Sequence, residues 1–150
     1  MKYLKRFESK DNSFDYSRYD DLNYIKKYIE NGGDLNKIDD HHEPFIINAA
    51  ENHNIPLLEF LIENGADINA VNSYGNTILH RLDYYYNNNK IIDIAIQAGI
   101  NWFIKNHIGK TFLEILESSS LKLEYKYIIE TYPEKYQEYL KWKKTKEFNL

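Results

Sequence analysis

Apolar and polar positions follow a helical period between Ile55 and Ile62. Leucine and isoleucine recur there at a spacing that places them along one side of a helix, at Leu57, Leu58, Leu61 and Ile62. Gly65 then supplies the positive φ that commonly ends a helix. A polar turn leads to Thr77, a candidate N-cap for the next helix. The stretch therefore predicts a helix, a glycine stop, a polar turn and the start of a second helix.

This unit recurs along the chain at a nearly fixed period. Gly32 and Gly65 are 33 residues apart, and Gly65 and Gly99 are 34 apart. The segments around the first two glycines match, since residues 30–36 read ENGGDLN and residues 63–69 read ENGADIN. A period of about 33 residues with two helices per unit predicts a solenoid of stacked helix pairs.

The run NGADINA, followed by YGNTILH, resembles the ankyrin repeat. The matching positions are Asn72, Gly75, Thr77, Leu79 and His80. The resemblance covers roughly residues 19–132, about three-quarters of the chain. It implies an all-α ankyrin-repeat solenoid of about four helix-turn-helix units, with hairpin loops between units and capping helices at the ends. It also implies a protein that binds other proteins and performs no chemistry.

We expect residues 1–150 to form one domain that is built from several repeats. We place them at 19–38, 39–71, 72–105 and 106–132, between an N-terminal cap at 1–18 and a C-terminal capping helix at 133–150. The second unit has Pro44 where the family has threonine, so its helix cap is weaker. In the third unit Thr77 to His80 begins the first helix, and Tyr84 to Asn89 replaces a short turn.

Composition narrows the class of protein. The hydrophobic content of 43% is that of a folded domain, and the formal charge of −4 provides no basic surface for nucleic acid. The absence of cysteine excludes disulfides and thiolate metal sites. No segment reads as a signal peptide or a membrane span, so we expect an intracellular, cytoplasmic protein. Frequent Asn, Ile, Lys and Tyr suggest an AT-rich genome, that of a virus or a bacterium.

No catalytic or metal-binding arrangement is evident in the sequence. The five histidines lie apart from any serine or cysteine nucleophile, and no further ligands stand at a metal-binding spacing from them. By resemblance to the family, His80 makes a structural hydrogen bond between turns. We therefore expect no enzyme activity, no metal and no cofactor.

The resemblance assigns partner binding to the hairpin tips and the first helices of the units. Phe103 joins these positions because it replaces an asparagine of the family and is a candidate exposed anchor. The candidate partner-binding residues are Asp40, His41, Glu43, Ser73, Tyr74, Asn76, Arg81, Tyr84, Tyr85, Phe103, His107 and Lys110. Tyrosine and arginine are enriched where protein interfaces bind most strongly, which favours the third unit as the centre.

Structural roles compete with several of these assignments. The chain has 14 tyrosines, and Tyr84 and Tyr85 could instead cover the lengthened turn. Trp102 takes the position of a packed valine, so we expect it to be buried. The acidic residues Asp40 and Glu43 are usually only solvated, but they would attract a basic partner if they are functional. The lysines of the C-terminal helix are more simply a solvated surface than a nucleic-acid or membrane patch.

These observations predict a non-catalytic module that docks one protein partner and is monomeric by itself. Two alternatives within binding remain open: an inhibitor that neutralises a toxin, nuclease or defence enzyme, and a viral or bacterial effector that acts on a host. An enzyme or a nucleic-acid binder on the same frame would belong to another class.

Overall fold

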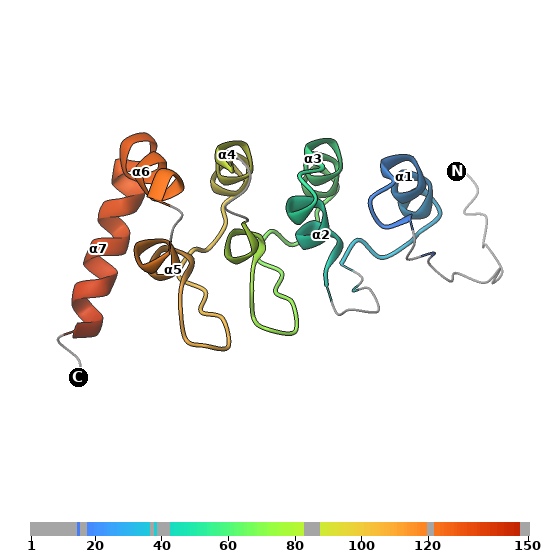
Figure 1. Ribbon diagram of the computed structural model, residues 1–150. Helices are drawn as coiled ribbons and strands as arrows, with labels where there is room; N and C mark the ends of the chain where they lie inside the picture. Colours follow the sequence, from blue (N-terminus) through green and yellow to red (C-terminus); the bar gives the residue numbers. More distant parts are fainter. Residues whose placement is uncertain are drawn as a thin grey trace, which may run out of the picture.

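The computed structural model describes residues 15, 18–36, 38, 43–82, 88–119 and 122–147, which form seven α-helices and one 3-10 helix (Figure 1). Within these residues the only β-type pairing is an isolated bridge between Ile38 and Pro44. The prediction of an all-α solenoid is confirmed. The expected N-terminal cap falls almost entirely outside the described residues.

The helices form two rows with hairpin loops beside the second row (Figure 1). One row contains the outer helices α1 (Leu22–Glu30), α3 (Ile55–Glu63), α4 (Asn89–Gln97) and α6 (Lys122–Thr131). The other contains α2 (Phe45–Glu51), the 3-10 helix η2 (Ile78–Arg81) and α5 (Phe112–Ser118). The last helix, α7 (Pro133–Glu147), lies across the end of the array next to α6.

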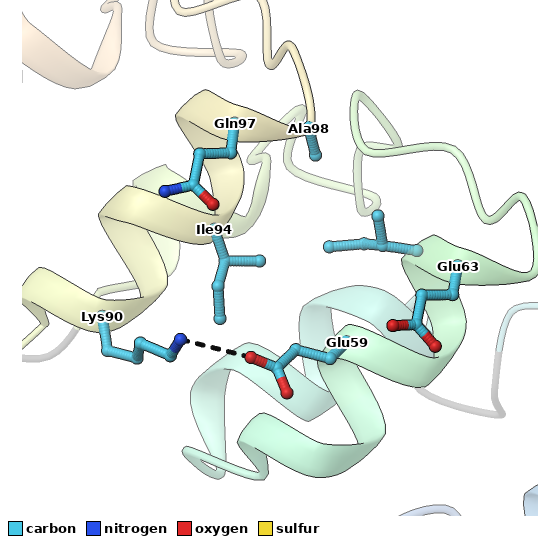
Figure 2. Close-up of a pocket in the computed structure, with 7 residues that line it drawn as sticks. Glu59, Glu63, Lys90, Ile94, Gln97 and Ala98 are labelled. Carbon is cyan, nitrogen blue, oxygen red and sulfur yellow. Dashed lines mark ion pairs between the residues drawn. The ribbon is translucent and has the colours of Figure 1, made fainter.

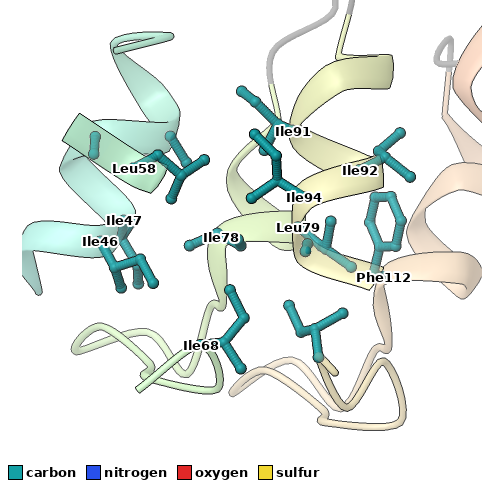
Figure 3. Packing of buried hydrophobic residues seen from close by; sticks show 14 of the residues in the cluster. Ile46, Ile47, Leu58, Ile68, Ile78, Leu79, Ile91, Ile92, Ile94 and Phe112 are labelled. Carbon is teal, nitrogen blue, oxygen red and sulfur yellow. The ribbon is translucent and has the colours of Figure 1, made fainter. Parts of the chain in front are cut away.

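One continuous apolar core runs through the layers, from Ile25 of α1 to Tyr139 of α7. Figure 3 shows Leu58, Ile78 and Ile91 facing one another between neighbouring units. The predicted stripe is confirmed at Leu57, Leu58 and Leu61, which are fully buried, whereas Ile62 is half-buried. Each unit therefore covers apolar side chains that its neighbour would otherwise expose to water.

Local sequence signals explain where the helices begin. Thr111 caps α5: its Oγ1 accepts from the N–H of Glu114 (3.3 Å), whose Oε2 accepts from the N–H of Thr111 (2.8 Å). Asn54 caps α3 through the N–H of Leu57 (3.2 Å). Pro44 is the N-cap of α2 and makes no side-chain cap, as its sequence implies.

The third unit differs from the prediction of a regular first helix. Thr77 precedes a 3-10 turn of four residues, and Leu82 already has extended backbone (φ −62°, ψ 130°). The short turn agrees with the sequence that follows, since tyrosine and asparagine are poorer helix formers than alanine or leucine. The repeat thus keeps its cap and its buried Ile78 and Leu79 with only one turn of helix.

Candidate protein-binding surface

The hairpin tips of the third and fourth units, residues 70–76 and 105–110, lie against each other. The carbonyl oxygen of Tyr74 accepts from the N–H of His107 at 2.9 Å. At Gly75, whose φ is +73°, an added Cβ would lie 2.8 Å from the His107 ring and 3.1 Å from the Asn106 Cα. Only glycine permits both this backbone conformation and this approach. The two tips are therefore held in one arrangement.

Asparagine side chains connect successive hairpins. Oδ1 of Asn72 accepts from the N–H groups of Tyr74 and Asn76, both at 3.0 Å, and its Nδ2 donates to Glu43 Oε1 at 2.7 Å. Asn106 repeats the pattern, since Oδ1 accepts from the N–H of Lys110 (3.1 Å) and Nδ2 donates to Asn76 Oδ1 (3.0 Å). Each amide shapes its own loop and binds the preceding one.

A second series of hydrogen bonds links the bases of the loops. Asn36 Oδ1 accepts from the N–H of Asp67 at 3.0 Å, and Asn69 Oδ1 accepts from the N–H of Asn101 at 2.7 Å. The equivalent residue of the next unit is Phe103, which has no acceptor. Its ring packs on Trp142 of α7 instead, with 5.4 Å between ring centroids.

His80 joins the third unit to the fourth. Its Nδ1 accepts from the N–H of Thr77 (3.2 Å), so Nε2 carries the proton and donates to the carbonyl oxygen of Lys110 (3.2 Å). Burial lowers the pKa of His80 from its ordinary value, against the opposing effect of the Lys110 carbonyl. The predicted structural hydrogen bond of His80 is confirmed.

Apolar side chains gather on the hairpins. Among the described residues, the large apolar side chains that are most exposed are Ile38, Val71, Tyr74, Ile108 and Leu123, and all but Leu123 lie in hairpin loops. Tyr74 is 66% exposed and Ile108 is 77% exposed, at equivalent positions of adjacent tips. Exposed apolar side chains grouped in this way are typical of protein contact surfaces.

The structure divides the predicted partner-binding residues into three groups. Ser73, Tyr74, His107 and Lys110 are exposed on the tips. A second group makes contacts within the fold: Glu43 accepts from Asn72, Asn76 accepts from Asn106, Arg81 forms an ion pair with Glu51, and Phe103 is half-buried against Trp142. The third group, Asp40, His41, Tyr84 and Tyr85, lies outside the described residues.

One of these placements changes an expected role, and that of the neighbouring Trp102 agrees with the prediction. Phe103 was a candidate exposed anchor, but it is half-buried because α7 supplies an aromatic neighbour. Trp102 is buried, which confirms the prediction of hairpin packing. Sequence reasoning missed Ile38 and Val71 as exposed positions, although their separation by one repeat period was a usable signal.

A shallow groove between the outer helices α3 and α4 lies away from the tips. Figure 2 shows Ile94 in it, flanked by an ion pair between Lys90 Nζ and Glu59 Oε1 at 3.3 Å. The groove holds about 300 Å³ and also contains Ile62 and Gln97.

In the part of the chain described here, no cluster of three or more His, Cys, Asp or Glu side chains is placed to hold a metal ion. No described helix is long and apolar enough to cross a membrane.

Stacked helix pairs whose hairpins project from one side define the chain as an α-helical repeat protein. The family model described as ankyrin repeats (many copies) matches residues 46–82. The chain belongs to the ankyrin-repeat family. Proteins of this family are generally non-catalytic modules that bind other proteins.

The relatives of the chain include ankyrin repeat proteins of viruses. An ankyrin repeat protein of monkeypox virus is 31% identical over 79% of this chain and 22% of the viral protein. A putative ankyrin repeat protein of fowlpox virus is 36% identical over 44% of the chain and 13% of that protein. A third, from Acanthamoeba polyphaga mimivirus, is 41% identical over 34% of the chain and 37% of that protein. The chain thus spans about a fifth of the length of the monkeypox relative.

Proposed function

We propose that this chain is a non-catalytic module that docks one protein partner on its hairpin tips and on the adjoining face of η2 and α5. The observation that supports this most is the pair of exposed side chains, Tyr74 and Ile108, on two tips joined by a backbone hydrogen bond. Because the loops are already ordered, binding there loses little conformational entropy.

The partner-binding residues that we retain are those whose side chains reach solvent on the tips. These are Ser73, Tyr74, His107 and Lys110, and we add Ile108 because its side chain is highly exposed. Three other candidates make contacts within the fold and would support binding indirectly, by holding the surface in shape. They are Asn76, Arg81 and Phe103. Asp40, His41, Tyr84 and Tyr85 remain candidates from the sequence.

The viral relatives favour one of the two alternatives, an effector that occupies a host protein inside the cell. The second alternative, an inhibitor that is attracted to a basic enzyme, requires acidic side chains on the hairpin tips. Glu43 contributes less to such a surface than expected, because it is half-buried and its Oε1 accepts from Asn72.

Affinity capture with a tip variant tests the proposed surface. The immobilised chain is incubated with lysate of the source or host cell, and bound proteins are quantified by mass spectrometry. A protein that binds wild type should be lost with the double variant Tyr74→Ser, Ile108→Ser. It should be retained by Leu123→Ser, which removes an equally exposed apolar side chain from α6. Equal retention by all three chains contradicts the proposal.

A further inference from the structure

The hairpin tips of the third and fourth units combine apolar side chains with positive charge and contain no acidic residue. Residues 70–76 and 105–110 include no Asp or Glu, while Lys105 and Lys110 are exposed on the fourth tip. Lys110 follows Ile108 by two residues, so its ammonium group belongs to the same loop as the most exposed apolar side chain of the tips. Neither lysine is paired with a carboxylate among the described residues.

Three carboxylates on the elements beside these tips, within the described residues, are already engaged. Glu43 accepts from Asn72, Glu51 pairs with Arg81, and Glu114 accepts from the N–H of Thr111. These contacts hold the acidic groups within the units. The third and fourth tips therefore present a surface that is apolar and positively charged, although the chain as a whole has a formal charge of −4.

We propose that the hairpin tips bind a protein segment in which apolar side chains stand next to carboxylates. The apolar side chains of the segment contact Tyr74 and Ile108, and its carboxylates meet the ammonium groups of Lys105 and Lys110. This inference rests on the proposed function and specifies the chemistry of the partner. It differs from the expectation of a basic partner, which followed from net charge and from Asp40 and Glu43.

The same charges do not make a nucleic-acid site. Such a site needs a basic stripe that contacts several phosphates, whereas the tips offer two lysines on an acidic chain. Charge complementarity with a segment that has only a few carboxylates matches this small number of cations. Salt should accordingly weaken the association mainly through its rate.

Selection from a phage-displayed library of random dodecapeptides on the full chain supplies a probe without knowledge of the natural partner. We expect enriched peptides to contain more Asp and Glu, together with more large apolar residues, than the unselected library. A synthetic copy of the leading peptide is then titrated by fluorescence anisotropy against wild type and variants.

Matched variants separate the two components of the surface. Tyr74→Ser with Ile108→Ser should weaken binding about thirty-fold, as expected for central apolar anchors. Lys110→Glu should weaken it about five- to ten-fold, mostly through slower association. Leu123→Ser and Lys144→Glu make the same chemical changes on α6 and α7 and should leave affinity unchanged. Thermal melts confirm that each variant is folded.

The outcomes distinguish this inference from the proposed function. Basic or uncharged peptides that are lost with the Tyr74 and Ile108 variants leave the docking surface standing but refute the acidic partner. Peptides that bind all variants equally, or no enrichment at all, contradict both. Binding of labelled oligo(dT) that is lost with Lys110→Glu and shows steep salt dependence would assign the tips to nucleic acid instead.

Discussion

Asn72 illustrates how one side chain can order a loop and join it to its neighbour. It is 4% exposed and uses both ends of its amide, accepting from its own loop and donating to Glu43. Aspartate has almost the same shape and can accept the same two bonds, but it has no donor. The need for a donor therefore selects asparagine at this position.

The variant Asn72→Asp tests this requirement. It removes the donor to Glu43 and places a second carboxylate beside the first, so the free energy of unfolding should fall by about 2 kcal/mol or more. Asn101→Asp is the matched control: Asn101 Oδ1 accepts from the N–H of Phe103, and Asp34 and Asp67 make the same bond in other units. Urea unfolding should show a large effect at the first position and little at the second.

His80 makes the stability of the third and fourth units depend on pH. Its pKa in the folded chain is lowered by burial from the ordinary value of 6.5. Below about pH 6.5 the unfolded chain takes up a proton that the folded ring resists, so stability decreases as the pH falls. Protonation would also place an N–H at Nδ1 against the N–H of Thr77.

We therefore expect wild type to lose more unfolding free energy than His80→Gln when the pH is lowered from about 7.5 to about 5.5. Urea unfolding of both chains at a series of pH values measures the difference, and the variant serves as the reference for all other titrating groups. Parallel pH profiles for the two chains would show that His80 does not contribute.

At the scale of the element, the third and fourth hairpins behave as a paired unit, and Gly75 is a point of close approach between them. Gly75 and Gly109 have nearly the same backbone conformation, with φ of +73° and +75°. They differ in surroundings, because a Cβ at Gly109 would meet nothing within 4 Å, whereas one at Gly75 would meet Asn106 and His107. Comparing alanine variants at these two glycines therefore separates the cost of backbone strain from the cost of a steric clash with the neighbouring hairpin.

Gly109→Ala should cost about 1 kcal/mol, the expected penalty for alanine at positive φ. Gly75→Ala carries the same strain plus the conflict with the neighbouring tip, so it should cost at least about 1 kcal/mol more. It should also weaken any partner bound across both tips. Thermal unfolding of the two variants measures the difference. Equal losses of stability would mean that the two tips move apart at little cost.

At the scale of the whole molecule, stability is transmitted between adjacent units only, because each unit contacts its neighbours. The end of the array depends on α7, where Trp142 packs on Phe103 and on Tyr139 (ring centroids 5.4 and 6.0 Å apart). Lys105 Nζ lies 5.6 Å from the same indole. Trp142 thus joins α7 to the fourth hairpin.

Trp142→Ala should lower stability by about 2 kcal/mol, less than for a fully buried tryptophan because the ring is half-exposed. Hydrogen exchange should show the loss in α5, α6 and the fourth hairpin, with protection in α2 and α3 retained. Lys144→Ala on the same helix should change neither quantity. A uniform loss along the chain would contradict the expectation of local coupling.

Much of the repeat frame could be predicted from the sequence because its signals are local. Leu57, Leu58 and Leu61 mark one buried side of a helix, and Gly65 marks its end within a few residues. The shortened turn at Ile78 was not predicted, because the cap at Thr77 is the same for a long helix and a short one, although the poor helix formers that follow Leu82 were a usable signal.

Contacts between residues far apart in the sequence escaped prediction. Asn88 is fully buried between His53 Nε2 (3.1 Å) and Glu124 Oε1 (3.2 Å), and these partners are 35 and 36 residues away, outside the repeat register. Asp93 likewise accepts from the hydroxyls of Tyr127 and Tyr132. The position of Phe103 depends on Trp142 in a helix that has no counterpart in the repeat pattern.

The two series of asparagine bonds have a direction, and this direction limits self-association. Each link needs an oxygen acceptor on the earlier hairpin, supplied by Asn36 and Asn69 at the bases and by Glu43 and Asn76 near the tips. The fourth unit offers Phe103 and Lys110 at those positions, and the first of them is already covered by α7. A second copy placed head-to-tail on this face would find neither acceptor there, so the asparagine bonds cannot continue from one copy into the next.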